Sequence, residues 1–371
     1  MALTKISRGL LNTGVSDSSD ATAITIDSSE NVTLAGTING VTIKADITNF
    51  TDSILISQNA STGTLSSASN NTGLGDSVFA ALTSGTSNVA IGNAAGTALT
   101  TGGGNTLIGS NAGDSLTTGT TSVAIGYNAL HTATTATGNV AIGYQALDVN
   151  TASNNTAIGL DAMGSNTTGD LNVAIGALAL DANTVGDRSV AVGYSALGSQ
   201  NPASNADMNN TAVGFFAGAG ITTGIKNTLI GSIAGDAITT ADNNTAVGFS
   251  ALTANTTGAG NVGVGTNALA ANTTVDNNTA VGFDSLASNT TGTPNTAVGK
   301  GALNANTTGS NNTGLGRAAL GNNTTADDNT AVGHYALLTN TTGANNTAVG
   351  RACLDANTTG AGNTAVGRVA L

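Results

Sequence analysis

Residues 244–260 have the sequence NTAVGFSALTANTTGAG, and variants of this 17-residue unit recur from Asn71 to the last residue. The consensus is N-T-A-V-G-x-x-A-L-x-x-N-T-T-G-x-x, with positions 1 to 17 counted from the first Asn. The position-5 glycine occurs 18 times, at steps of 17 residues except for one step of 16 and one of 21. The long step contains Pro202, which indicates an insertion in an exposed loop.

The unit predicts strands and turns rather than helix, because glycines and paired threonines have poor helix propensity. In Asn139–Gly143, Val and Ile alternate with a small residue, as in a strand with one buried face. Ala-Leu at positions 8 and 9 indicates a second strand, and Asn-Thr-Thr-Gly supplies a turn. We therefore predict an all-β fold: a parallel β-solenoid of about 18 coils, each with two short strands and two turns. Coils about 4.8 Å apart would form a rod on the order of 85 Å long, in which stacking buries the Val and Leu side chains.

Asparagine occupies position 1 in 16 of the 18 units, with Ser122 and Ser189 as the exceptions. Stacked coils would align these side chains into a ladder in which each amide bonds to the next. We therefore interpret the Asn residues as structural rather than as glycan acceptors. Cys353 stands where neighbouring units have Ala, so we expect a small core residue, and a single cysteine provides no disulfide framework.

The composition excludes several classes of protein. Of 371 residues 51 are Gly and 2 are Pro, Trp is absent, and charged residues make up 8%. Disordered chains are usually richer in charge and Pro, collagen needs Gly at every third residue, and no apolar run is long enough to insert into a membrane. Each coil has few apolar side chains to offset its ordering entropy. Because small residues at positions 3 and 5 would let neighbouring chains approach closely, we expect an oligomer, most simply three rods side by side.

The net charge of −12 does not suit nonspecific binding of nucleic acid. The opening segment MALTKISRGLLNTGVSD lacks the apolar stretch of a secretory signal, so we expect synthesis in the cytoplasm without Sec export.

No pattern in the sequence indicates catalysis, a cofactor or a metal. The GxGxxG match at 258–263 lacks the strand and helix of a nucleotide site, and the repeat already accounts for its glycines. His131 and His334 are far apart and have no ligands at metal-site spacing. Carboxylates such as Asp76 and Asp161 fall on distant coils, which disfavours glycoside hydrolysis. Adjacent threonines would face opposite ways in a strand, which disfavours ice binding.

Two sets of side chains follow the position-5 glycine and are candidates for surface contact. Eight of the ten aromatic residues lie at positions 6 and 7: Tyr127, Tyr144, Tyr194, Phe215, Phe216, Phe249, Phe283 and Tyr335. These rings either cover the ends of the apolar core or stack against sugars along the rod. The last five units carry basic residues at position 6: Lys300, Arg317, His334, Arg351 and Arg368. These either extend into solvent or bind an anionic partner such as lipopolysaccharide phosphates, acidic sugars or the acidic face of a following domain.

The repeat resembles two families. Ser122–Gly126 and Asn172–Gly176 resemble the head repeat of trimeric autotransporter adhesins, which implies a left-handed parallel β-roll and a homotrimer. The longer consensus with Asn-Thr-Thr-Gly is similar to repeats of phage-type tail fibre proteins, which are often followed by a self-cleaving chaperone domain. The first 43 residues also resemble the N-terminal segments of phage fibre proteins.

We expect two regions: an N-terminal attachment module at 1–70 and a solenoid shaft at 71–371. Within the module we expect a hairpin and two further strands, at Ala23–Ile26, Val32–Leu34, Val41–Ile43 and Ile54–Ile56. The favoured hypothesis is a structural, non-enzymatic virion fibre of the phage tail or head. It would be a homotrimer that binds other virion proteins through residues 1–70 and contacts a host-surface glycan or other receptor. The alternative is the head of a bacterial trimeric surface adhesin.

Overall fold

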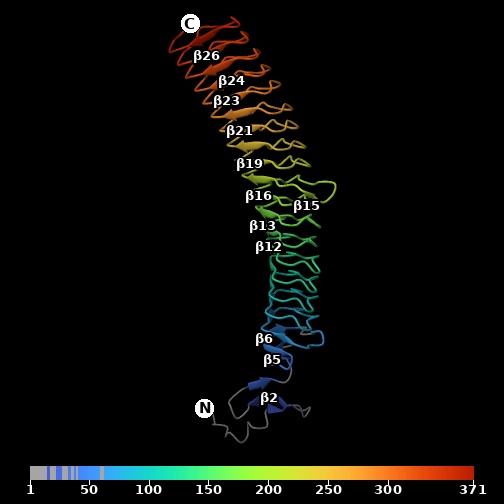
Figure 1. Cartoon of the computed structure of the whole chain (residues 1–371). Coiled ribbons are helices and arrows are strands. Elements are labelled where there is room, and N and C mark those ends of the chain that lie inside the picture. Colours follow the sequence, from blue (N-terminus) through green and yellow to red (C-terminus); the bar gives the residue numbers. More distant parts are fainter. Residues whose placement is uncertain (1–14, 17–21, 27–31, 35–36, 39–40, 59–61) are drawn as a thin grey trace, which may run out of the picture.

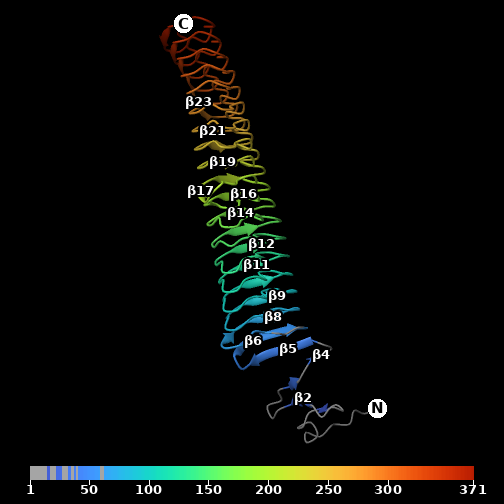
Figure 2. The ribbon, with the colours of Figure 1, turned by 90° about the vertical axis from the view of Figure 1, so that its right-hand side faces the viewer.

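A computed structural model describes residues 15–16, 22–26, 32–34, 37–38, 41–58 and 62–371. The repeat forms a long, gently curved rod of stacked coils, with the strands aligned along one side (Figures 1 and 2). None of the described residues belongs to a helix that could cross a membrane.

The elements are all strands, most of them three residues long. Their bounds are β1 Val15–Ser16, β2 Thr22–Ile26, β3 Val32–Leu34, β4 Thr37–Ile38, β5 Val41–Ile47, β6 Phe50–Ser57, β7 Ala68–Ser69, β8 Thr72–Leu74, β9 Val89–Ile91, β10 Thr106–Ile108, β11 Val123–Ile125, β12 Val140–Ile142, β13 Thr156–Ile158, β14 Val173–Ile175, β15 Gly186–Asp187, β16 Val190–Val192, β17 Ala206–Asp207, β18 Thr211–Val213, β19 Thr228–Ile230, β20 Thr245–Val247, β21 Val262–Val264, β22 Thr279–Val281, β23 Thr296–Val298, β24 Thr313–Leu315, β25 Thr330–Val332, β26 Thr347–Val349 and β27 Thr364–Val366.

The N-terminal strands form antiparallel pairs, of which the pair of β2 and β3 is the predicted hairpin. β2 pairs with β3, and β5 pairs with β6. β6 also pairs in parallel with β8, so the solenoid sheet begins before residue 71. Phe50, Leu55 and Phe79 are fully buried at this end and close the core with large side chains. Such an atypical terminal unit is what a solenoid needs to cover its first coil.

The repeat itself is the predicted parallel β-solenoid. Eighteen strands, from β8 to β27 without the short β15 and β17, pair in parallel and in register. Equivalent residues therefore lie on top of one another, as Val298 of β23 lies beside Leu315 of β24. The long step forms a loop that projects from the rod near β15 (Figure 1). Most of that loop is exposed as expected, but Pro202 is buried.

The prediction of a second strand in each coil is wrong. The Ala-Leu segment is a chain of turns, because positions 7 and 9 have positive φ, as in Ser250 (55°) and Leu252 (54°). A strand requires negative φ throughout, so these residues cannot belong to one. The backbone still bonds between coils, since the Leu252 N–H donates to the Ala268 carbonyl at 3.0 Å.

The predicted orientation of the strand is also wrong. Position 3, the small residue, points into the core and is fully buried, as in Ala246. The Val, Ile and Thr side chains at positions 2 and 4 point outward, and Ile230 is 40% exposed. The reason is the thinness of the coil: Leu252, from the turn side, already lies 3.4 Å from where a Cβ on Gly263 would be. The small residues therefore face the chain's own interior, which removes the argument that they allow neighbouring chains to approach.

Positions 3 and 9 compensate for one another in size. Where position 3 is Leu107, the facing position-9 residues are Gly96 and Gly113, and a Cβ on either glycine would lie 2.8 Å from a Leu107 methyl. The same exchange recurs at Leu229 with Gly218 and Gly235. In these coils position 12 is Leu or Ile instead of Asn. The core therefore holds a nearly constant volume with the large residue on either wall.

Two columns of buried amides run along the rod. At position 1, the Asn244 Oδ1 accepts the backbone N–H of Asn261 at 2.9 Å, and the Asn261 side chain donates to the Val275 carbonyl at 2.8 Å. Ser122 takes the same role with its hydroxyl, which accepts the Asn139 N–H at 3.3 Å. At position 12, Asn306 donates to Asn289 at 2.9 Å. The predicted ladder is confirmed, although its most constant bond is from side chain to backbone. Cys353 is buried at position 8, as expected.

Exchanging the large and small partners tests the constant core volume. Leu107→Ala should lower the free energy of unfolding by about 2–5 kcal/mol through a cavity. Gly113→Leu should lower it by about 1–3 kcal/mol through overpacking. The double variant has Ala at position 3 and Leu at position 9, as most other coils do. Denaturant unfolding should therefore show that the double variant is more stable than either single variant. Additive losses would contradict the compensation.

Removing one amide of the position-1 column should destabilise the rod. Asn261→Ala leaves the Asn278 N–H without its partner and removes one of the two side-chain amides that donate to the Val275 carbonyl, and we expect a loss of about 1–3 kcal/mol in denaturant unfolding. Asn261→Ser is the matched control, because Ser122 shows that a hydroxyl can accept the N–H of the next coil. It should lose clearly less than the Ala variant, and equal losses would show that the hydrogen bond is unimportant.

Candidate binding surface

Position 6 lies at the corner where the chain leaves the strand. The preceding glycine makes this corner possible, since Gly248 has a φ of 135° and a Cβ there would lie 2.6 Å from the carbonyl carbon of Gly265. The side chain of position 6 then points away from the core. Because the strands are in register, these side chains form one column along the rod.

The aromatic members of the column lie outside the core and are about half exposed. Tyr127, Tyr144 and Tyr194 are 44–49% exposed, and Phe215, Phe249 and Phe283 are 47–55% exposed. The rings therefore do not cover the ends of the core, which was one of the two alternatives. They contact one another instead: the ring centroids of Tyr127 and Tyr144 are 5.4 Å apart and the rings are nearly parallel.

A second aromatic cluster lies on the two coils that the long loop connects. Tyr194 stacks on Phe215 at 5.7 Å, and Phe216 packs edge-on against both rings. Phe216 is at position 7, with a φ of 54°, so it points along a different direction from the column. Stacked and edge-on pairs of this kind are stabilising in themselves.

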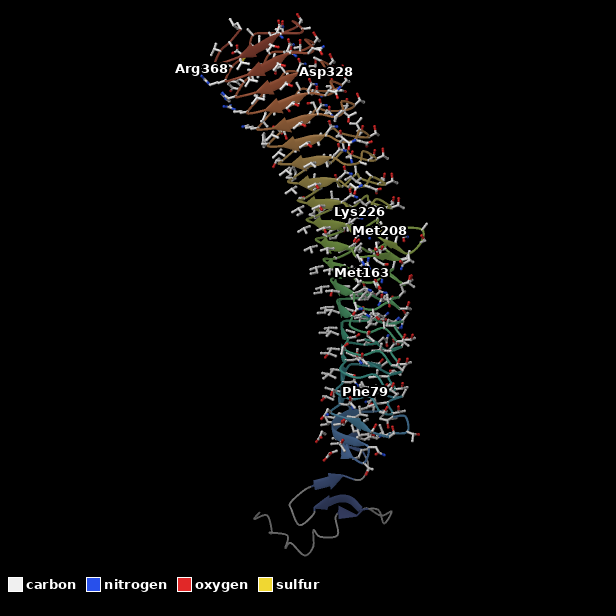
Figure 3. The ribbon with its side chains drawn as sticks, in the orientation of Figure 1. Phe79, Met163, Met208, Lys226, Asp328 and Arg368 are labelled. Atoms are coloured by element: carbon white, nitrogen blue, oxygen red, sulfur yellow. The ribbon has the colours of Figure 1, made fainter. Side chains whose placement is uncertain are left out.

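The basic members occupy the C-terminal end, where Figure 3 shows Arg368 on the strand side of the rod. The five coils are consecutive and in register, so the predicted column forms from Lys300, Arg317, His334, Arg351 and Arg368 at position 6. Two of them lie over aromatic rings. The Lys300 Nζ is 5.3 Å from the centre of the Phe283 ring, and the Arg317 Cζ is 5.3 Å from the centre of the Tyr335 ring. Among the residues that the structure describes, none of the five pairs with a carboxylate.

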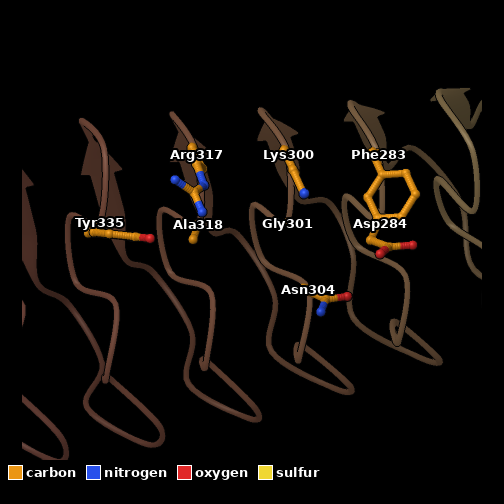
Figure 4. A pocket seen from close by; sticks show the side chains of 8 residues that line it. All are labelled: Phe283, Asp284, Lys300, Gly301, Asn304, Arg317, Ala318 and Tyr335. Carbon is orange, nitrogen blue, oxygen red and sulfur yellow. The ribbon is translucent and has the colours of Figure 1, made fainter.

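These contacts border a cleft of about 230 Å³. It is lined by Phe283, Asp284, Lys300, Gly301, Asn304, Arg317, Ala318 and Tyr335 (Figure 4). Figure 4 shows the two cations between the ring of Phe283 on one side and that of Tyr335 on the other. The rings and the cations are among the predicted contact residues, whereas their shared cleft with Asp284 and Asn304 was not predicted. One signal in the sequence could have indicated the cleft: position 7 is occupied by small residues, Gly301 and Ala318, in two adjacent units.

The other candidate chemistry remains scattered. His131 lies between two carboxylates of neighbouring coils, with Nε2 3.4 Å from Asp114 and Nδ1 3.1 Å from Asp148. Burial raises the pKa of Asp114, and the nearby His131 acts in the opposite direction. Within the described ranges, no three His, Cys, Asp or Glu side chains are grouped so as to hold a metal ion.

Comparison with known proteins finds no family model, no curated protein and no solved structure that matches the chain.

The stack of Tyr127 on Tyr144 should be measurable as a coupling. Tyr127→Ala and Tyr144→Ala should each reduce the free energy of unfolding, and a double-mutant cycle should give about 0.5–1.5 kcal/mol of interaction. Tyr144→Ala combined with Phe249→Ala is the control, since those rings lie on distant coils and their effects should add. A coupling of zero between Tyr127 and Tyr144 would contradict a contribution of the stack to stability.

Proposed function

We propose that the chain is a structural fibre subunit that assembles side by side with two further copies into a rigid trimeric rod. The observation that carries this proposal is the outward face of the solenoid sheet. Leu74, Ile175, Val213, Ile230, Leu315 and Val349 on this face are 36–48% exposed in the single chain. Figure 3 shows mostly carbon atoms on the strand side and many oxygen and nitrogen atoms on the turn side.

An apolar stripe along the whole repeat is unusual for a protein that stays alone in water. The partner that fits it best is a second copy of the same rod. The stripe repeats at the spacing of parallel strands, about 4.8 Å, and only a rod with the same spacing can match it over many coils. A closed ring of such rods would leave no copy of the face exposed, which favours a symmetric assembly over an open one. The resemblance to trimeric autotransporter head repeats supports three copies.

We further propose that this fibre belongs to a virion, the phage particle, where it holds a host-contact surface away from the particle. The resemblance of the repeat and of the first 43 residues to phage fibre proteins supports this hypothesis. Residues 1–70 would bind other virion proteins, and the exposed column at position 6 would face the host glycan or other receptor. The role is structural and not enzymatic. A bacterial surface adhesin remains the second candidate, and neighbouring genes for capsid and tail proteins would distinguish the two.

Charges on the outward face should break the assembly. The test variant carries Lys at position 4 of three consecutive coils: Ile230→Lys, Val247→Lys and Val264→Lys. The matched control carries Lys at the exposed position 14 of the same coils: Thr240→Lys, Thr257→Lys and Thr274→Lys. Analytical ultracentrifugation should show trimers for the wild type and the control, and a loss of at least tenfold in association for the test variant. A wild-type chain that sediments as a folded monomer of 35.6 kDa would contradict the proposed function.

A further inference from the structure

We propose that the cleft between Phe283 and Tyr335 binds an acidic sugar, a hexose ring that carries a carboxylate. Its role in host contact rests on the proposed function, but binding itself depends only on the residues of the cleft. The cleft lies at the corner that follows the strand and extends from position 6 toward Asn304 at position 10. None of its lining residues is at position 2 or 4, which form the apolar face that other copies would cover.

The cleft exists because two consecutive coils have small residues at position 7. Gly301 has a φ of 65°, and no heavy atom lies within 4 Å of where its Cβ would be. Ala318 follows in the next coil, whereas Asp284 and Tyr335 occupy position 7 on either side. The opening is therefore two coils long, or about 10 Å at the spacing of stacked strands. Its volume of about 230 Å³ is below the ~300–1,000 Å³ of pockets for drug-sized ligands, so it suits one sugar ring.

The walls and the cations suit the two parts of such a ligand. The faces of aromatic rings are electron-rich and attract the positively polarised C–H groups of a sugar ring. Lys300 and Arg317 lie over the two rings, each 5.3 Å from a ring centre, so a sugar that packs against the exposed part of a ring places its carboxylate beside a cation. The planar guanidinium of Arg317 can bind a carboxylate through two parallel hydrogen bonds.

The two polar uncharged or acidic residues of the lining, Asn304 and Asp284, favour a sugar with one negative charge over a phosphate. The Asp284 carboxylate can accept hydrogen bonds from the hydroxyls of a sugar ring, and the Asn304 amide can both donate to them and accept from them. The same Asp284 carboxylate opposes a doubly charged phosphate. A second cleft, lined by Leu178, Asp181, Ser195, Gly198, Ser199, Phe216 and Ala219, includes no cation and does not suit an acidic ligand.

Filling the cleft tests the proposal without changing the fold. Gly301→Phe is compatible with the backbone, because Phe216 and Tyr335 occupy the same position with φ of 54° and 65°. Ala94→Phe is the matched control, at position 7 of a distant coil with φ of 58°. The probes are oligogalacturonate, a neutral galacto-oligosaccharide of equal length and inorganic phosphate, each titrated into the full chain by calorimetry. We expect wild type and Ala94→Phe to bind oligogalacturonate alone, and Gly301→Phe to bind it at least tenfold more weakly.

A second pair of variants separates the cleft from the general charge of the column. Arg317→Gln should weaken binding of oligogalacturonate at least tenfold, whereas Arg368→Gln, outside the cleft, should leave it within twofold of wild type. Equal losses for the two arginines, binding that survives in Gly301→Phe, or preference for phosphate or the neutral oligosaccharide would each overturn the proposal. Monomeric rods that still bind oligogalacturonate would refute the proposed assembly but not this site. Trimers that fail to bind it would refute this site but not the assembly.

Discussion

The structure depends on the stacking of each coil on the next in the same register. Every position meets its own equivalent about 4.8 Å away, so a side chain must tolerate a near-identical neighbour above and below. At position 5 this excludes any side chain, since a Cβ would collide with the glycine of the next coil. Within the coil, the two walls are so close that only one can carry a large residue. The strand wall therefore has Ala opposite Leu, and the exchange of Leu107 for two facing glycines follows the same constraint.

Register also explains why polar side chains occupy a thin core. A buried amide without partners is costly, yet Ser57 Oγ is the one buried side-chain polar atom without a partner in the described part of the chain. The asparagines of position 1 achieve this because each accepts the N–H of the next coil and donates to the carbonyl at position 15 of its own unit, as Asn261 does. A slip by one residue would place apolar groups against these amides and leave them unpaired. The columns therefore specify the alignment of coils as well as stabilising it.

Periodicity allowed much of this fold to be predicted from the sequence. The coil length, the strand at positions 2 to 4, the amide ladder and the hairpin of β2 with β3 all follow from local patterns. The inward face of the strand could not be predicted, because alternation defines two faces but not which one meets the opposite wall. The second strand was wrongly predicted at positions 8 and 9, because Leu rarely adopts positive φ. Neither the composition nor the repeat pattern indicates that the Leu residues at position 9 have this conformation. The columns of rings and cations followed from the period, whereas the cleft depends on a gap shared by Gly301 and Ala318.

The repeat varies most at positions whose side chains point away from the core. Positions 1, 3, 5 and 9 are held by hydrogen bonds, volume or backbone conformation, and substitutions there come in compensating sets. Positions 6 and 7 meet few such limits, and they carry eight of the rings and most of the cations of the repeat, whereas exposed carboxylates such as Asp276 and Asp327 lie at position 16. Surface chemistry can therefore change coil by coil while the core stays the same, from Tyr127 and Tyr144 in the fourth and fifth coils to Arg351 and Arg368 in the last two. Small residues at position 7 of two consecutive coils, such as Gly301 and Ala318, open a cleft whose walls are already set at the spacing of the coils. A solenoid of this kind can thus acquire a cleft by substitutions to small residues in adjacent coils, without any change in its fold.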